Sequence, residues 1–370
     1  MTNLKISNVP SMSADKAVSR LSASYLALIR SGVPFEKFPA TMLWGPPGVG
    51  KSRLVRQIAE EIESGTGKKV SVTDVRLLLF NPIDLRGIPV ADEKKTVAVW
   101  LRPKIFQMDA SKSKINVLFL DEISAAPPSV QAAAYQIVLD RTVGEHKLPD
   151  NCIVIAAGNR VTDKSVAFKM PKALANRLMH FEIEPDFGSW ERWAVKNGIH
   201  KSVLGFLSFK RDYLFGFDAN RDDLAFATPR TWEMVSSILK HVSDDLSDVY
   251  PMVAGVVGTG VAMEFKAWTK VYDQMPSVEK IFDGKEHNVP VLPDVLYALV
   301  SSLVSAAREC YDDYKLANSV KYALRMPPDF STMMLKEYIY LGEDYKKRLM
   351  RIPEFTRWVS SAGRLLNGII

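Results

Sequence analysis

The residue pattern with the clearest chemistry in this chain is a glycine-rich loop that ends in a lysine and a serine. It fits GxxxxGKS, the Walker A pattern, and it lies between an apolar run and an amphipathic helical pattern. Glycines let backbone N–H groups approach a phosphate chain at the positive end of a helix. Lys51 can reach the outer phosphates, and the Ser52 hydroxyl can join a Mg2+ shell. The predicted nucleotide-binding residues are Gly45, Pro46, Pro47, Gly48, Val49, Gly50, Lys51 and Ser52.

Two carboxylates follow an apolar run of strand length. Residues 117–120 lead directly into Asp121 and Glu122, which is a Walker B pattern. A buried parallel strand that ends in this way brings both carboxylates to the edge of the sheet where the phosphate-binding loop opens. We expect Asp121 to hold the hydration shell of Mg2+, and Glu122 to orient and deprotonate an attacking water. Acidic residues at strand ends are also common in turns, but the Walker A loop upstream favours catalysis.

A third polar group follows the next apolar run. Residues 152–157 read as a buried strand, and Asn159 comes two residues after it. If this strand lies between the Walker A strand and the Walker B strand, the Asn159 side chain can hold the hydrolytic water and sense the γ-phosphate. Asparagine is also a frequent turn residue, so the prediction depends on the two upstream motifs.

Strand and helix patterns alternate through the first half of the chain, and helical patterns dominate after about residue 185. This order predicts an α/β fold with a parallel sheet and right-handed crossovers, in which ligands collect at the carboxyl ends of the strands. The predicted strands are 41–44, 70–75, 117–120 and 152–157, and the predicted helices include 14–29, one that follows Ser52, and 127–140.

One segment does not fit a simple strand-helix-strand crossover. Residues 81–103 contain a short apolar stretch, a charged tip at 91–95 and an alternating stretch at 96–100. This pattern predicts a small β-hairpin that projects from the body. On the pattern alone, a functional hairpin and a plain surface loop are equally good interpretations.

The composition is that of an ordinary globular chain. It has 370 residues, 47% of them hydrophobic, and a net charge of +6 spread along the sequence without a polybasic run. Nucleic-acid contact therefore stays open but is not indicated. Cys152 and Cys310 have no CxxC spacing, and the isolated His180, His200 and His241 predict no metal site. We expect a cytoplasmic protein without a secretion signal or a membrane span.

The motifs together resemble those of a known family. The Walker A loop, the Walker B pair, Asn159, the segment 171–177 and the triplet 228–230 occur in the order found in AAA+ ATPases. The hairpin at 81–103 resembles the helix-2 insert, which marks the MoxR and dynein-related branch. The resemblance covers roughly residues 14–265. It implies ATP and Mg2+ as cofactors and a homo-oligomeric, hexameric ring, and it favours a substrate-facing role for the hairpin.

The resemblance also assigns three arginines. In that family an arginine near the end of the core reaches the γ-phosphate held by the neighbouring subunit, and Arg177 matches this position. Arg160, next to Asn159, is a rival for the same role. Arg230 follows Thr228 and Pro229, good N-cap and N1 residues, and it resembles the sensor 2 arginine of a helical lid. The predicted catalytic set is therefore Glu122, Asn159, Arg177 and Arg230.

Three domains are expected on this basis: an α/β nucleotide-binding core at 1–185, a helical lid at 186–265, and a C-terminal helical extension at 266–370. No motif of the family can be aligned with the extension. Its apolar residues predict the core of a small helical bundle, with a partner-binding face as the lesser interpretation. These residues are Tyr338, Tyr340, Leu341, Leu349, Ile352, Phe355 and Trp358.

The resemblance implies a MoxR-like ATP hydrolase that remodels or activates a protein client, commonly one with a von Willebrand factor A domain. A nucleic-acid-directed AAA+ motor, or a restriction-type NTPase, is the main alternative. A nucleotide-controlled binding module without turnover is a third, and the presence of Glu122 argues against it. ATP is favoured over GTP by the family, because no guanine-reading motif is apparent.

Overall fold

The computed structural model describes residues 9–163, 168, 170–272, 274–308 and 310–361. The chain divides into two compact units, and each is described by itself. The first unit comprises residues up to Lys196 together with Leu214–Trp232, and the second comprises Asn197–Tyr213 together with Glu233 onward.

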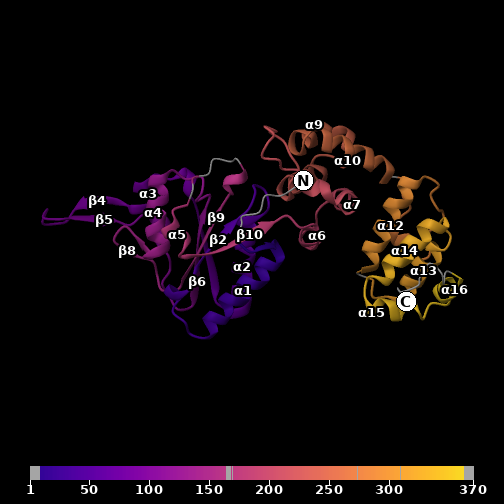
Figure 1. Cartoon of the computed structure of the whole chain (residues 1–370), viewed down its shortest axis with the longest axis horizontal. Helices are drawn as coiled ribbons and strands as arrows, with labels where there is room; N and C mark the ends of the chain where they lie inside the picture. Colours follow the sequence, from indigo (N-terminus) through magenta and orange to yellow (C-terminus); the bar gives the residue numbers. More distant parts are fainter. Residues whose placement is uncertain (1–8, 164–167, 169, 273, 309, 362–370) are drawn as a thin grey trace. The chain divides into compact units, whose positions relative to one another are not determined.

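A six-stranded parallel sheet forms the centre of the first unit (Figure 1). Its strand order is β1-β10-β2-β9-β6-β3, so β9 lies between β2 and β6, as the sequence predicted for the strand before Asn159. The carboxyl ends of β2, β9 and β6 therefore lie side by side. The bounds are β1 Ser11–Ser13, β2 Ala40–Trp44, β3 Lys69–Arg76, β6 Lys114–Asp121, β9 Cys152–Gly158 and β10 Leu178–Glu184.

The three strands that carry the motifs are central because both of their faces are apolar. Successive side chains on a strand point to opposite faces. On β2, Met42 faces one hydrophobic cluster and Leu43 the other. On β6, Leu118 and Phe119 divide in the same way. Continuous apolar runs therefore identified these strands, as expected for a parallel sheet covered on both faces.

Helices cover both faces of this sheet. The face that includes Leu43 packs against α1 and α2, and the face that includes Met42 packs against α4. The helix α2 ends at Gly67, which adopts the left-handed conformation that glycine favours at a helix C-terminus. The bounds are α1 Ala14–Arg30, α2 Lys51–Thr66, α4 Pro128–Leu139, α5 Lys172–Ala175 and α6 Phe187–Lys196.

The predicted hairpin is confirmed. Strands β4 (Ile88–Ala91) and β5 (Ala98–Leu101) pair antiparallel and extend away from the sheet (Figure 1), after the short helix α3 (Pro82–Arg86). A second hairpin, β7 (Thr142–Val143) with β8 (His146–Lys147), was not predicted. It touches the first one, because His146 Nε2 lies 2.6 Å from the carbonyl oxygen of Trp100.

Where the structure describes the second unit, its regular elements are all helices. Its largest hydrophobic cluster includes Tyr338, Leu349, Ile352 and Phe355, with Leu341 and Trp358 packed against it. The prediction was wrong for Tyr340, whose side chain is exposed because it lies at the end of α14, facing away from the cluster. The bounds are α7 Lys201–Phe209, α8 Pro229–His241 (which starts in the first unit), α9 Leu246–Val257, α10 Thr259–Tyr272, α11 Val278–Phe282, α12 Pro293–Arg308, α13 Asp313–Ala323, α14 Pro328–Ile339, α15 Glu343–Leu349 and α16 Pro353–Ser361. Over the described residues, no helix combines the length and the apolar character that crossing a membrane requires.

Candidate active site

The glycine-rich loop connects the end of β2 to the start of α2. Gly45, Gly48 and Gly50 all have positive φ angles, of 157°, 78° and 99°. L-residues with a side chain rarely adopt this conformation, which explains why the loop is built of glycine. A Cβ at Gly48 would also lie 2.7 Å from the Thr228 hydroxyl oxygen, so the loop and the segment before α8 pack too closely for any larger residue.

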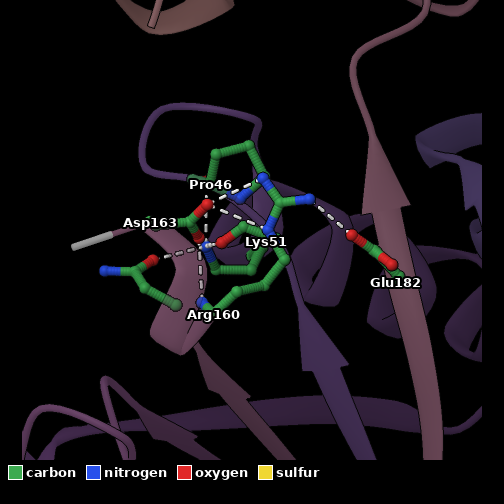
Figure 2. Close-up of polar contacts among 7 residues, drawn as sticks. Pro46, Lys51, Arg160, Asp163 and Glu182 are labelled. Atoms are coloured by element: carbon green, nitrogen blue, oxygen red, sulfur yellow. Dashed lines mark hydrogen bonds and ion pairs between the residues drawn. The ribbon is translucent and has the colours of Figure 1, made fainter. Parts of the chain in front are cut away.

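Lys51 is buried in the first turn of α2, and its ammonium group is surrounded by oxygens. It donates to the carbonyl oxygens of Gly45 (2.7 Å) and Pro46 (3.1 Å) and to Asn159 Oδ1 (2.9 Å). Figure 2 shows the ammonium beside Pro46 and Asp163. Burial lowers the pKa of Lys51 to about 8, although the negative charges of Asp121 and Asp163 act in the opposite direction.

The pH dependence of nucleotide binding follows from this pKa. Only protonated Lys51 attracts phosphate, and bound phosphates favour the protonated form, so binding above about pH 8 requires proton uptake. We expect the Kd of a fluorescent ADP analogue to be constant below about pH 8 and to rise above it, by up to about tenfold per pH unit. Lys51→Arg is the control, because arginine stays charged and should give a flat profile. A flat profile for the wild-type chain would contradict the prediction.

The oxygens predicted to hold Mg2+ lie together. The Ser52 hydroxyl donates to Asp121 Oδ2 at 3.0 Å, and the other oxygen of Asp121 accepts the backbone N–H of Glu122 at 2.9 Å. A hydroxyl and a carboxylate are hard oxygen donors, the type that Mg2+ prefers when phosphates and water complete its shell. The two side chains therefore fit the ion.

Glu122 follows Asp121 with a left-handed backbone, at φ 57°. This conformation is uncommon for a residue with a side chain and is often found at functional sites. The turn that follows is held by backbone hydrogen bonds from Ala125 and Ala126 to the carbonyl oxygen of Glu122. The half-buried Glu122 is thus fixed at the edge of the sheet, one residue after the carboxylate that contacts Ser52.

Asn159 is tied to the Walker B turn as well as to Lys51. Its backbone N–H donates to Ser124 Oγ at 2.9 Å, and the N–H of Ile123 donates to the carbonyl oxygen of Ala157 at 3.0 Å. Sequence reasoning did not find Ser124, because nothing in its local pattern distinguishes it from an ordinary turn serine. The structure therefore brings together Lys51, Ser52, Asp121 and Asn159 from three neighbouring strand ends.

The comparisons with known proteins agree with this geometry in the core. Residues 40–180 match the sequence model of a family described as "ATPase family associated with various cellular activities (AAA)". This match covers less than half of the chain. Together with the sheet order, it agrees with the α/β fold of a P-loop AAA+ core. No curated protein matches the chain significantly.

Solved structures similar to the whole chain have low sequence identity. A RuvB variant from Thermotoga maritima is 18% identical, with 82% of this chain and 86% of that chain covered and a TM-score of 0.37. The ORC2 protein of Aeropyrum pernix is 10% identical, with 91% and 89% covered and a TM-score of 0.41. PCH-2 of C. elegans is 14% identical, with 70% of each chain covered and a TM-score of 0.33. At these scores the similarities carry no argument about function.

The two rival arginines of the AAA+ core have opposite environments. Arg160 is buried, and its guanidinium pairs with Asp163 at 2.7 Å and with Glu182 at 2.5 Å (Figure 2). Arg177 is exposed after α5, and within the described residues its side chain makes no hydrogen bond or ion pair. A side chain that must reach another subunit has to be exposed, so the geometry favours Arg177 over Arg160.

The segment that carries Arg177 is linked to the phosphate-binding strand of the AAA+ core. Trp44 Nε1, which can only donate, lies 2.9 Å from His180 Nδ1, so the imidazole carries its proton on Nε2. That nitrogen donates to the carbonyl oxygen of Ala175 at 2.8 Å, two residues before Arg177. His180 therefore links the end of β2 to the segment that carries Arg177 through both of its ring nitrogens.

Arg230 lies in the first turn of α8, as its sequence context predicts. Thr228 accepts the N–H of Thr231, and Thr231 Oγ1 accepts the N–H of Thr228, so the two threonines cap the helix reciprocally. The pKa of Lys51 is lowered mainly by burial, and the positive charge of Arg230 lowers it further. The sensor 2 role of Arg230 remains a prediction.

Proposed function

We propose that this chain is an AAA+ ATPase that hydrolyses Mg-ATP at the interfaces of a homo-oligomeric ring. The observation that carries the proposal is the convergence of Lys51, Ser52, Asp121 and Asn159 at one sheet edge, with Glu122 adjacent. These are the groups that phosphoryl transfer requires: a phosphate cradle, ligands for a metal, a base and a polar side chain for the attacking water. The exposed Arg177 supplies the group that this site lacks.

In the proposed reaction, water attacks the γ-phosphorus of ATP. The bond between that phosphorus and the β–γ bridging oxygen breaks, which gives ADP and phosphate. Lys51 holds the outer phosphates, and Glu122 orients the water and accepts its proton. Asn159 holds the water or a γ-phosphate oxygen. Ser52 and Asp121 would hold Mg2+, which would supply positive charge to offset the negative charge of the outer phosphates. Arg177 from the next subunit stabilises the charge that develops on the transferred group.

We assign the chain to the MoxR-like type and propose that it remodels or activates a protein client. The β4–β5 hairpin supports this proposal, since it is inserted between β3 and β6 and projects from the core. Its two strands expose several apolar side chains, with Ile88 and Leu101 paired across them, and apolar side chains that gather on a surface often mark a site that binds protein. The exposed apolar residues are Ile88, Val97, Val99 and Leu101.

The test of the proposed function is the dependence of ATPase activity on protein concentration. If sites form only between subunits, the specific activity should rise with concentration and level off as rings form. Activity that is constant down to the monomeric range would contradict the proposal. ATPase stimulation by DNA or RNA, with a steep dependence on salt, would favour the nucleic-acid-directed alternative instead.

A further inference from the structure

Four charged side chains are buried together beside the phosphate-binding loop. Lys51 is 9% exposed, Arg160 7%, Asp163 4% and Glu182 0%. Buried charges are destabilising unless each is paired, and this group contains two positive and two negative charges. Of these four side chains, only Lys51 belongs to the predicted phosphate-binding loop, so the other three call for a separate explanation.

Arg160 joins the two strands on either side of the phosphate-binding strand. It follows β9, and it pairs with Glu182 on β10. In the sheet register, Glu182 is opposite Trp44 of β2, and Trp44 is opposite Gly158 of β9. The Arg160 side chain therefore spans β2 at the level where the glycine-rich loop begins, and it fixes β9 relative to β10.

Asp163 holds the turn that directly follows Asn159. Its Oδ2 accepts the backbone N–H of Arg160 at 2.9 Å, and its own N–H donates to the carbonyl oxygen of Arg160 at 3.0 Å. Its Oδ1 accepts Arg160 Nε at 2.9 Å and Nη2 at 2.7 Å. One carboxylate thus fixes both the backbone and the side chain of the residue next to Asn159.

We propose that Asp163 is a positioning residue that holds Asn159 against Lys51, so that Asn159 reads the γ-phosphate. The inference rests on the proposed function and adds a residue to its site. Asp163 acts through Arg160, because it holds both the backbone and the guanidinium of the residue next to Asn159.

The test is Asp163→Asn, which keeps the shape but removes the charge and turns an NH2 group toward Arg160. We expect kcat to fall by about 10- to 100-fold, the effect of losing a hydrogen bond to a charged group, while the Kd for ADP changes much less. The ratio of the ATPγS and ADP affinities should also approach one.

Glu182→Gln is the matched control, because it breaks the same network on β10 and leaves the turn after Asn159 intact. It should lower the Tm without changing the ratio of the ATPγS and ADP affinities. If Asp163→Asn does not fold, Arg160→Lys keeps the buried positive charge but loses the two-pronged contact to Asp163, and the same loss of ATPγS discrimination is expected. An Asp163→Asn chain with a lower Tm but an unchanged kcat and affinity ratio would overturn the inference. Absence of turnover in the wild-type chain would instead contradict the proposed function.

Discussion

An Arg177→Ala chain is expected to bind nucleotide normally and to lose about 10³-fold or more of its ATP hydrolysis, as is found when an arginine finger is removed. The guanidinium stabilises charge that appears only in the transition state, so its loss should reduce kcat and leave binding intact. Arg177 is exposed, and its side chain makes no hydrogen bond or ion pair with the residues that the structure describes. The free energy of unfolding of the subunit should therefore change by no more than about 0.5 kcal/mol.

Mixing two inactive variants tests whether Arg177 acts between subunits. Arg177→Ala keeps an intact Lys51 and Glu122, and Glu122→Gln keeps an intact Arg177. In a ring with head-to-tail interfaces, an equal mixture should place an intact finger beside an intact site at roughly a quarter of the interfaces. We therefore expect ATPase activity to return on mixing. Full activity of Arg177→Ala alone would contradict the assignment.

Two further variants separate Arg177 from Arg160. Arg177→Lys keeps the charge but loses the planar, two-pronged geometry, so it should recover only part of the activity. Arg160→Ala leaves the buried carboxylates of Asp163 and Glu182 without their partner. Breaking one side of a buried ion pair costs about 3–5 kcal/mol, so this variant should fail mainly through lost stability. A stable Arg160→Ala chain with the kinetic defect of a missing finger would reverse the assignment.

The central strands and the motif residues could be predicted because their signals are local. A run of apolar residues is enough to identify a strand covered on both faces, and Asp121 follows such a run directly. The strand β1 could not be found in this way. It has only three half-buried residues, and its place in the sheet comes from pairing with β10, about 170 residues away in sequence. The β7–β8 hairpin, with two residues in each strand, is equally weak as a pattern.

The burial of Arg160 and the exposure of Arg177 could not be predicted, because they too depend on residues distant in sequence. Arg160 and Arg177 both lie near strand ends, and the sequence left both open as the intersubunit finger. Their difference depends on Glu182, which lies 22 residues beyond Arg160 and reaches it only across the sheet. The role of Asp163 was also missed, since an acidic residue four positions after an asparagine looks like part of an ordinary turn.

A Glu122→Gln chain is expected to bind ATP with near wild-type affinity and to hydrolyse it about 10²- to 10⁴-fold more slowly, the usual contribution of a general base. Glutamine keeps the size and hydrogen-bonding shape of the side chain but cannot accept the proton of the water. Asp121 and Ser52 are unchanged, so Mg2+ and phosphate binding should persist. Single-turnover hydrolysis and a binding titration with ATP check both parts, and a wild-type rate would exclude Glu122 as the base.

Because this variant should hold ATP without turnover, it is also suited to retaining a client. The control is Glu122→Gln combined with Lys51→Ala, which should not bind ATP and should therefore recover no client. Adding Val99→Asp and Leu101→Asp to Glu122→Gln places charge on the exposed hairpin without disturbing the nucleotide site. If the hairpin contacts the client, these changes should abolish recovery while ATP binding remains. The protein-client proposal would be contradicted if nucleic acid were recovered in an ATP-dependent way and the hairpin substitutions did not reduce its recovery. The ATPase would then act on a polyanion through another surface.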